Sequence, residues 1–191
     1  MSPGGHLVTT AAACAASAAL TESLPLTAGI ALGGFLIDVD HAIDYVLVER
    51  QRDLRPSAFL RYYLGGRVRR AVLVLHSYEL FALLVAVAWW TDALPLWGYL
   101  LGGLMHLALD VIFNGELTPR SIGAFYSFAY RLAHRFDAVA LFGPPDDRLV
   151  PQGFWRAFFA GAEVPAAATR FPAVFTTGPG KNLDSLRSDL P

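Results

Sequence analysis

Residues 94–113 read LPLWGYLLGGLMHLALDVIF, and only His106 and Asp110 interrupt this run with a charged or imidazole side chain. The run matches the roughly 20 apolar residues that cross the hydrocarbon core of a bilayer as a helix. Three further apolar stretches precede it, from about His6 to Leu20, Leu24 to Val48 and Ala71 to Trp90. None alternates with the period of two that strands require, so the sequence predicts an all-α bundle of about four transmembrane helices.

The composition also separates this chain from ordinary soluble proteins. Apolar residues make up 54% of the 191 residues and charged residues only 16%, where about 25% is usual. So few charges would not cover the surface of a soluble domain, whereas lipid accepts an apolar surface directly. The net charge of -1 gives no electrostatic reason to expect nucleic acid as a partner, and the single cysteine, Cys14, excludes an internal disulfide. We therefore expect an integral membrane protein.

The connections between the apolar stretches differ in their basic residues. Thr21 to Pro25 and Thr91 to Pro95 each contain one acid and no base, whereas arginines are frequent in the linker 50–70 and after the fourth stretch. Basic loops stay on the cytoplasmic side of a membrane. Four spans with both termini in the cytoplasm place every arginine-rich segment on that side. Residues 121–141 have apolar side chains at helical spacing, which predicts an amphipathic helix on the cytoplasmic face.

Ionisable side chains interrupt every apolar stretch, although such groups are costly inside a membrane. They are His6 in the first stretch, Asp38, Asp40, His41 and Asp44 in the second, His76 and Glu79 in the third, and His106 and Asp110 in the fourth. With the topology above, all of these residues lie toward the cytoplasmic side, at roughly the same height. Since the topology was inferred from loop arginines, this coincidence independently indicates one shared site.

Imidazole and carboxylate side chains together suit zinc, manganese or iron. We expect the metal ligands and their close partners among His6, Asp38, Asp40, His41, His76, His106 and Asp110. This set exceeds one tetrahedral zinc shell, so it predicts either one divalent ion with hydrogen-bonded partners or two ions about 3.5–4 Å apart. Zinc is the first expectation, with manganese and iron as alternatives.

An ion with an open position activates water for attack on an ester, phosphoester or amide. We expect Glu79 and Asp44 as the catalytic carboxylates, acting as general base or, for Glu79, as a further ligand. Structural explanations exist for single residues: a lone histidine often only hydrogen-bonds a neighbouring helix, and Asp44 could pair with Arg50. The whole set is harder to explain by independent structural roles.

The chain divides into two parts by composition. From Gly143 onward prolines and glycines recur, and the last dozen residues have the composition of a disordered segment. We therefore expect a membrane-embedded helical domain with the metal site, residues 1–142, followed by a Pro/Gly-rich, partly disordered C-terminal tail, residues 143–191. Within the tail, Phe154 to Phe159 predict a short interfacial turn.

The order of the motifs resembles that of a known family. The YdjM-like family has similar motifs to Gly5-His6, Asp38-Val39-Asp40-His41, His76-Ser77, and Gly98-Tyr99 followed by His106 and Asp110. The resemblance covers residues 5 to about 120, and Ile37 and Leu75 stand where the family has Pro and Thr. It implies a multi-pass protein of a bacterial-type inner (plasma) membrane with metal-dependent hydrolase activity, and it names no substrate.

Together these observations predict a membrane-bound metal-dependent hydrolase that acts on a lipid or a membrane-proximal ester or phosphoester. A transporter for metal ions or protons is the first alternative. Its path would need polar residues at several depths, whereas 80–90 and 94–105 carry no charged or imidazole side chain. The second alternative is a structural or regulatory membrane protein that a fully coordinated metal stabilises.

Overall fold

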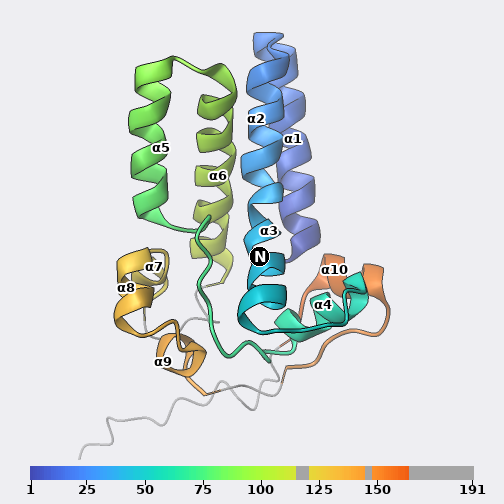
Figure 1. Ribbon diagram of the computed structural model, residues 1–191. Coiled ribbons are helices and arrows are strands. Elements are labelled where there is room, and N and C mark those ends of the chain that lie inside the picture. The colour runs from blue at the N-terminus through green and yellow to red at the C-terminus, as the bar shows by residue number, and fades with distance from the viewer. Residues whose placement is uncertain (115–120, 145–147, 164–191) are drawn as a thin grey trace, which may run out of the picture.

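The computed structural model describes residues 1–114, 121–144 and 148–163, and within these ranges the chain is helical with no strand (Figure 1). Two isolated bridges, Arg70 with Asp137 and Leu149 with Glu163, join loops instead. The helices are α1 (Pro3–Thr21), α2 (Leu24–Gly34), η1 (Leu36–Asp38), α3 (Val39–Ile43), η2 (Asp44–Val48), α4 (Pro56–Leu64), α5 (Tyr78–Thr91), α6 (Leu94–Phe113), α7 (Ile122–Phe125), α8 (Phe128–Ala133), α9 (Ala138–Phe142) and α10 (Phe154–Ala160). The all-α prediction is confirmed for this part of the chain.

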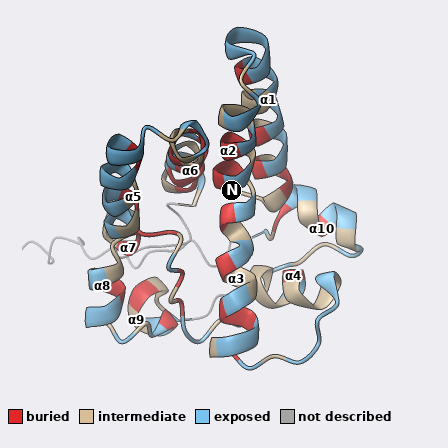
Figure 2. Cartoon of the chain, turned by 45° about the horizontal axis from the view of Figure 1, so that its top comes forward, coloured by how far each residue is buried: buried red, intermediate tan, exposed pale blue. Residues whose placement is uncertain are grey.

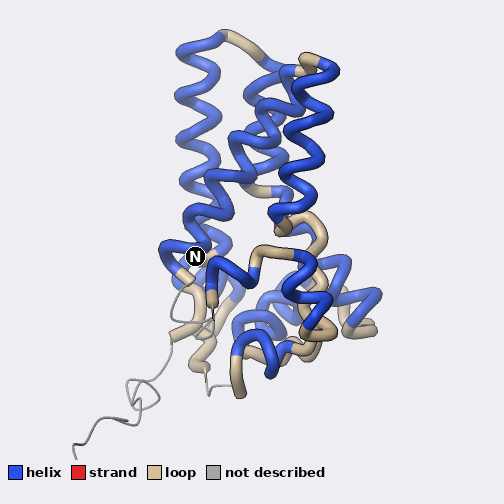
Figure 3. The backbone as a smooth tube through the Cα atoms, turned by 90° about the vertical axis from the view of Figure 1, so that its left-hand side faces the viewer, coloured by secondary structure: helices blue, strands red, loops and turns tan. Residues whose placement is uncertain are grey.

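Two helical hairpins form the main body of the molecule. α1 turns into α2 and α5 turns into α6 at the same end, so the four helices stand side by side (Figures 1 and 3). Both turns use a residue with left-handed backbone conformation, Glu22 at φ 50° and Asp92 at φ 49°, after which a proline in the first turn starts the next helix. The short acidic turns predicted from the sequence are therefore both hairpin turns.

The two hairpins are joined by close backbone packing between α2 and α6. A Cβ on Gly33 would overlap the carbonyl oxygen of Tyr99, and one on Gly102 would overlap that of Ile30. Gly29 and Gly98 face each other's helix in the same way. The spacing of four residues on both helices is the small-residue pattern that lets helices in membranes approach closely. This contact brings the C-terminal end of α2 against the second half of α6.

The shorter helices gather at the other end of the bundle: α7, α8 and α9 lie below α5 and α6, and α4 and α10 lie on the side of α1 and α3 (Figure 1). Two predictions are corrected here. The third apolar stretch becomes helical only at Tyr78, and residues 71–77 run as irregular chain. The single amphipathic helix expected over 121–141 is three short helices, because Ser127 and Asp137 cap new helices and Arg135 and Phe136 have positive φ values.

By length and composition, α6 is the one helix among the described residues that could cross a membrane on its own. A second such span exists only if α2 and residues 36–48 count as one, and these two pieces are bent by 44°. α5 is apolar but has only 14 residues. Of the roughly four predicted spans, one or two are therefore supported by helix length and composition. The predicted turn at Phe154 is helix α10, and the last dozen residues, where we expected disorder, lie outside the described residues.

Candidate metal centre

The structure gathers all seven predicted ligand residues at the end of the bundle where the short helices lie. They form three overlapping triads, in each of which the ligand atoms lie within 4.8 Å of one another. The triads are His6, His106 and Asp110; Asp38, His76 and His106; and Asp40, His41 and His76. His106 and His76 each belong to two of them, so the three triads form one continuous cluster.

Hydrogen bonds fix the orientation of the two shared imidazoles. His106 donates from Nδ1 to the carbonyl oxygen of Gly34 at 2.9 Å, and a carbonyl can only accept. His76 places Nδ1 3.1 Å from both carboxylate oxygens of Asp40, which accept its proton. A neutral ring that donates from Nδ1 carries its lone pair on Nε2. Both lone pairs therefore point at the same place, and the two Nε2 atoms lie 3.2 Å apart.

Asp38 completes this central group with a third electron-rich atom. Its Oδ1 lies 3.4 Å from Nε2 of His76 and 3.4 Å from Nε2 of His106. Ligands around a tetrahedral zinc with bonds of about 2.0–2.1 Å are about 3.3–3.4 Å apart. The three atoms thus form a triangle with the dimensions of one face of a zinc tetrahedron. With both imidazoles neutral, a bound cation would satisfy all three atoms at once. The residues fit a divalent metal.

His6 and Asp110 extend this centre on the side of α1. Nε2 of His6 lies 2.9 Å from Oδ1 of Asp110, and the His6 ring stacks on His106 with ring centroids 3.7 Å apart. The other Asp110 oxygen, Oδ2, is 3.4 Å from Nε2 of His106. Asp110 can therefore share a second ion with His6 and His106.

Carboxylates of η2 and its neighbours hold the irregular segment that carries His76. We call residues 69–76 the strap. Glu49 Oε1 accepts the backbone N–H groups of residues 69 and 70, Asp44 Oδ2 accepts those of 72 and 73, and Asp40 Oδ2 accepts those of 75 and 76. Each carboxylate thus takes two successive N–H groups. Asp40 fixes the backbone and the ring of His76 together, the kind of hydrogen bond that orients metal-binding histidines.

A local change of helix type brings these three carboxylates onto one face. Asp40 and Asp44 are four residues apart, as an α-helix requires for one face. Glu49 follows after five residues, and five α-helical residues would turn it away by roughly 140°. Residues 44–48 instead form a π-turn, in which Glu49 N–H bonds to the Asp44 carbonyl at 2.8 Å. Bonding over five residues brings Asp44 and Glu49 onto the same side.

Arg131 holds the strap from the opposite side, a role that its sequence position did not reveal. Its fully buried guanidinium donates to the backbone carbonyl oxygens of Val72, Leu73, His76 and Phe125 over 2.7–3.1 Å. Leu73 has φ 46°, a conformation that a buried leucine adopts only when its surroundings hold it there. Burial lowers the pKa of Arg131, while the carboxylates of Asp40 and Glu79 oppose that shift.

The two predicted catalytic carboxylates lie in different places. Asp44 lines the cavity beside the cluster and uses Oδ2 for the strap, so the Asp44–Arg50 pair considered as an alternative is replaced by backbone contacts. Glu79 is not brought to the cluster. It accepts hydrogen bonds from the Ser127 hydroxyl and from two N–H groups at the start of α8, at 2.6–3.1 Å, and so caps that helix.

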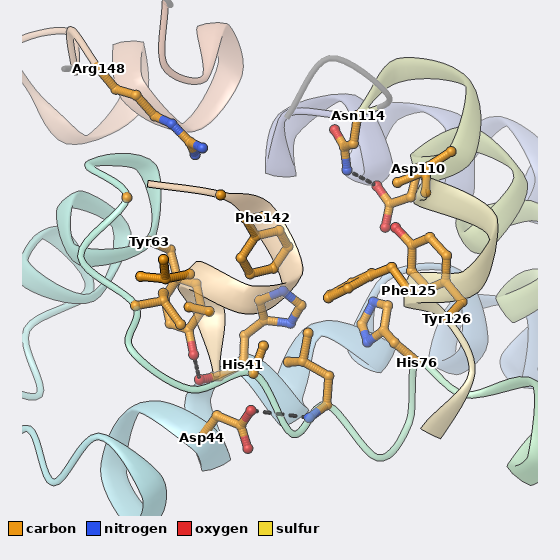
Figure 4. A pocket seen from close by; sticks show the side chains of 18 of the residues that line it. His41, Asp44, Tyr63, His76, Asp110, Asn114, Phe125, Tyr126, Phe142 and Arg148 are labelled. Atoms are coloured by element: carbon orange, nitrogen blue, oxygen red, sulfur yellow. Dashed lines mark hydrogen bonds between the residues drawn. The ribbon is translucent and has the colours of Figure 1, made fainter. Parts of the chain in front are cut away.

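A cavity of about 190 Å³ adjoins the cluster, as Figure 4 shows. His41, His76 and Asp110 reach it from the cluster, and Leu73, Phe125 and Phe142 form apolar parts of its wall. Tyr63, Tyr126 and Arg148 also face it. These last three residues were missed from the sequence, because nothing in their spacing links them to the histidine motifs and the fold alone brings them here.

Two phenols near the site are held neutral. Burial and the neighbouring Asp110 carboxylate raise the pKa of Tyr126, which is 3% exposed. Burial also raises the pKa of Tyr62, to about 12, together with its hydrogen bond to Glu49. Burial alone would raise the pKa of Glu49, but hydrogen bonds from Tyr62 and from Arg69 and Arg70 hold it below its ordinary value. Glu49 is therefore an ionised anchor of the strap at neutral pH.

No protein-family model matches this chain, and no curated protein or solved structure gives a significant match. The resemblance to the YdjM-like family thus stays an interpretation of the motifs. What is established for the described residues is the cluster itself: histidine and aspartate groups placed where they could hold a metal ion.

Proposed function

We propose that this protein is a membrane-bound, metal-dependent hydrolase of the kind that the YdjM-like motifs imply. One observation carries the proposal: the triangle of Asp38 Oδ1, His76 Nε2 and His106 Nε2 has the edge lengths of a zinc tetrahedron and adjoins a cavity. A structural zinc site uses four protein ligands, whereas a catalytic one keeps a position for water or substrate. A triangle beside a cavity favours the catalytic kind.

The outer surface of the bundle supports a membrane location. Exposed residues cover much of α5 and α1 away from the cluster (Figure 2). Many are large and apolar, and Trp89 and Trp90, at the far end of α5, are 80% and 89% exposed. Tryptophan is enriched where membrane-spanning helices meet the lipid headgroups. We infer that the hairpin turns lie at one membrane surface and the metal centre near the other, and the arginine-rich linker makes that second surface the cytoplasmic one.

A divalent ion in the triangle would supply an activated water and polarise the bond to be cleaved. The chain supplies the remaining functions. Asp40 keeps the Nε2 lone pair of His76 directed at the ion site, and the Gly34 carbonyl does the same for His106. Asp44 lines the cavity and is the carboxylate we assign as general base. Tyr126, neutral and hydrogen-bonded to Asp110, holds that carboxylate at the edge of the cavity.

The experiment that tests this proposal is the metal content of detergent-purified protein, measured by elemental mass spectrometry without chelator. We expect one or two equivalents of a divalent transition metal, zinc first, in the wild type. His106→Ala should lose it, since His106 belongs to two of the triads. Asp40→Asn should lower it by misorienting His76.

The matched control is His134→Ala. His134 ends α8, belongs to none of the triads and bonds the Tyr130 carbonyl at 2.8 Å. Its removal should leave metal content unchanged. Full metal content in His106→Ala, or a wild type that takes up neither zinc nor manganese after reconstitution, would reject the metal centre and with it the hydrolase.

A further inference from the structure

The cavity beside the metal centre contains a cation that the centre does not use. Arg148 lines the cavity, and Figure 4 shows its guanidinium directed into it. The Nε atom is buried and has no hydrogen-bond partner within the described part of the chain. A buried donor without an acceptor is unfavourable and is rare in folded proteins, and a ligand in the cavity would supply the missing acceptor.

The position of Arg148 depends on a close approach to the turn after α4. Gly66 has φ 65°, and a Cβ there would lie 3.6–3.8 Å from the guanidinium and its neighbouring atoms. The side chain therefore lies along the backbone of this turn. Arg148 is thus half-buried against the cavity wall, with its Nε atom covered.

The remaining walls define what the cavity can hold. His76 and Asp110, members of the metal cluster, face it from another side in Figure 4, and Leu73, Phe125 and Phe142 add apolar surface. Its volume of about 190 Å³ is below the roughly 300–1,000 Å³ of pockets that enclose whole drug-sized ligands. It suits a small charged group with a short apolar neighbour, and longer apolar parts would have to extend out of it.

We propose that Arg148 binds the phosphate of a phosphomonoester and that this ester is the substrate class of the hydrolase. This inference rests on the proposed function. A guanidinium forms paired hydrogen bonds with phosphate oxygens, and the cavity that Arg148 lines is also lined by His76 and Asp110 of the metal cluster. A neutral carboxylic ester offers Arg148 no such partner. Hydrolysis adds one water, breaks the ester P–O bond and releases an alcohol and inorganic phosphate, with no other reactant.

The test measures binding of phenylphosphonate, whose P–C bond resists hydrolysis, to full-length protein in detergent by calorimetry. The variants are Arg148→Ala, Arg148→Lys and the control Arg52→Ala, which removes an exposed arginine outside the cavity. Metal content is measured on each sample. We expect Arg148→Ala to bind about ten- to hundredfold more weakly with its metal retained, Arg148→Lys to recover part of the loss, and Arg52→Ala to match the wild type.

Equal affinity in Arg148→Ala and wild type, or no binding by a metal-loaded wild type, would overturn the assignment of Arg148. If the wild type carries no metal but binds phenylphosphonate through Arg148, the anion site stands and the hydrolase fails. Turnover of phenyl phosphate is then compared with that of phosphatidic acid in detergent micelles, both releasing inorganic phosphate. Cleavage of phenyl phosphate alone identifies a soluble phosphomonoester as the substrate, and cleavage of phosphatidic acid alone identifies a lipid one. If the metal-loaded wild type cleaves neither, the proposed substrate class is wrong.

Discussion

The two ends of the helical bundle are held together by different means. Toward the hairpin turns, α2 and α6 meet through glycines that allow backbone contact, and the outer surface is apolar. At the metal end, buried carboxylates, imidazoles and Arg131 hold irregular chain through directed hydrogen bonds. At the first end, α2 and α6 are held by van der Waals contact between their backbones. At the second end, the fold is held by individual hydrogen-bond donors and acceptors. Substitutions at Arg131, Gly33, Glu49 and Glu79 would distinguish these two kinds of stabilisation.

Replacing Arg131 should cause the largest loss at the metal end. Arg131→Met removes donors from four buried carbonyl groups, at about 1 kcal/mol for each hydrogen bond, so we expect about 4 kcal/mol lower stability. The strap should loosen and metal content should fall with it. Denaturant unfolding followed by circular dichroism, with metal analysis, measures both. Arg156→Met, at an exposed position of α10, is the control, and equal behaviour of the two variants would contradict the role of Arg131.

A single methyl group should disturb the glycine-packed end almost as strongly. Gly33→Ala places a Cβ against the Tyr99 carbonyl, which forces α2 and α6 apart and costs about 2–3 kcal/mol. Gly123→Ala makes the same substitution where nothing lies within 4 Å and should be neutral or slightly stabilising. Thermal unfolding of the two variants in the same detergent compares them. Similar melting temperatures would show that the hairpins do not pack through this contact.

Glu49 tests the strap through its dependence on pH. Its folded pKa is lowered, so its stabilising effect is present above the ordinary glutamate pKa and is lost as pH falls through the folded value. At pH 7 we expect Glu49→Gln to be about 1–2 kcal/mol less stable than the wild type. The difference should narrow on acidification from about pH 6 to about pH 3. A difference that stays constant over this range would mean that the charge of Glu49 is not what holds residues 69 and 70.

Replacing Glu79 should have the smallest effect on stability. The variant also distinguishes a helix-capping role of Glu79 from a catalytic one. Glu79→Gln weakens the hydrogen bonds at the start of α8, which we expect to cost about 0.5–1 kcal/mol. Metal content and turnover should stay at wild-type levels. A large loss of turnover in a folded, metal-loaded Glu79→Gln protein would restore the catalytic role that the sequence suggested.

The membership of the cluster could be predicted because burying ionisable groups is costly. His6, Asp40, His76, His106 and Asp110 stand out in apolar sequence, and the chain gives them few reasons to be there other than one another. The prediction that these residues lie at a similar depth, toward the cytoplasmic side, came from the arginines in the loops alone. The same reasoning predicted the two acidic hairpin turns and the helical class, since both depend on local composition.

The parts that could not be predicted depend on long-range contacts. Residues 71–77 are apolar enough to predict the start of a helix, but two carboxylates, Asp40 and Asp44, and the guanidinium of Arg131 satisfy their backbone groups in an irregular form. The π-turn before Glu49 has no sequence signal of its own. Arg131 looked like a loop arginine that only sets topology, because its four carbonyl partners become neighbours only after folding.

The hydrogen bonds from Arg131 also determine the order in which parts of the protein can form during synthesis. His76 and its buried partner Arg131 are 55 residues apart in the chain, and every other ligand residue of the cluster precedes Arg131. While the chain is being made, both hairpins can therefore form with all members of the cluster present and the strap still open. The cluster becomes rigid only after α8 has emerged from the ribosome, so a chain cut short before residue 131 should form both hairpins without completing the cluster.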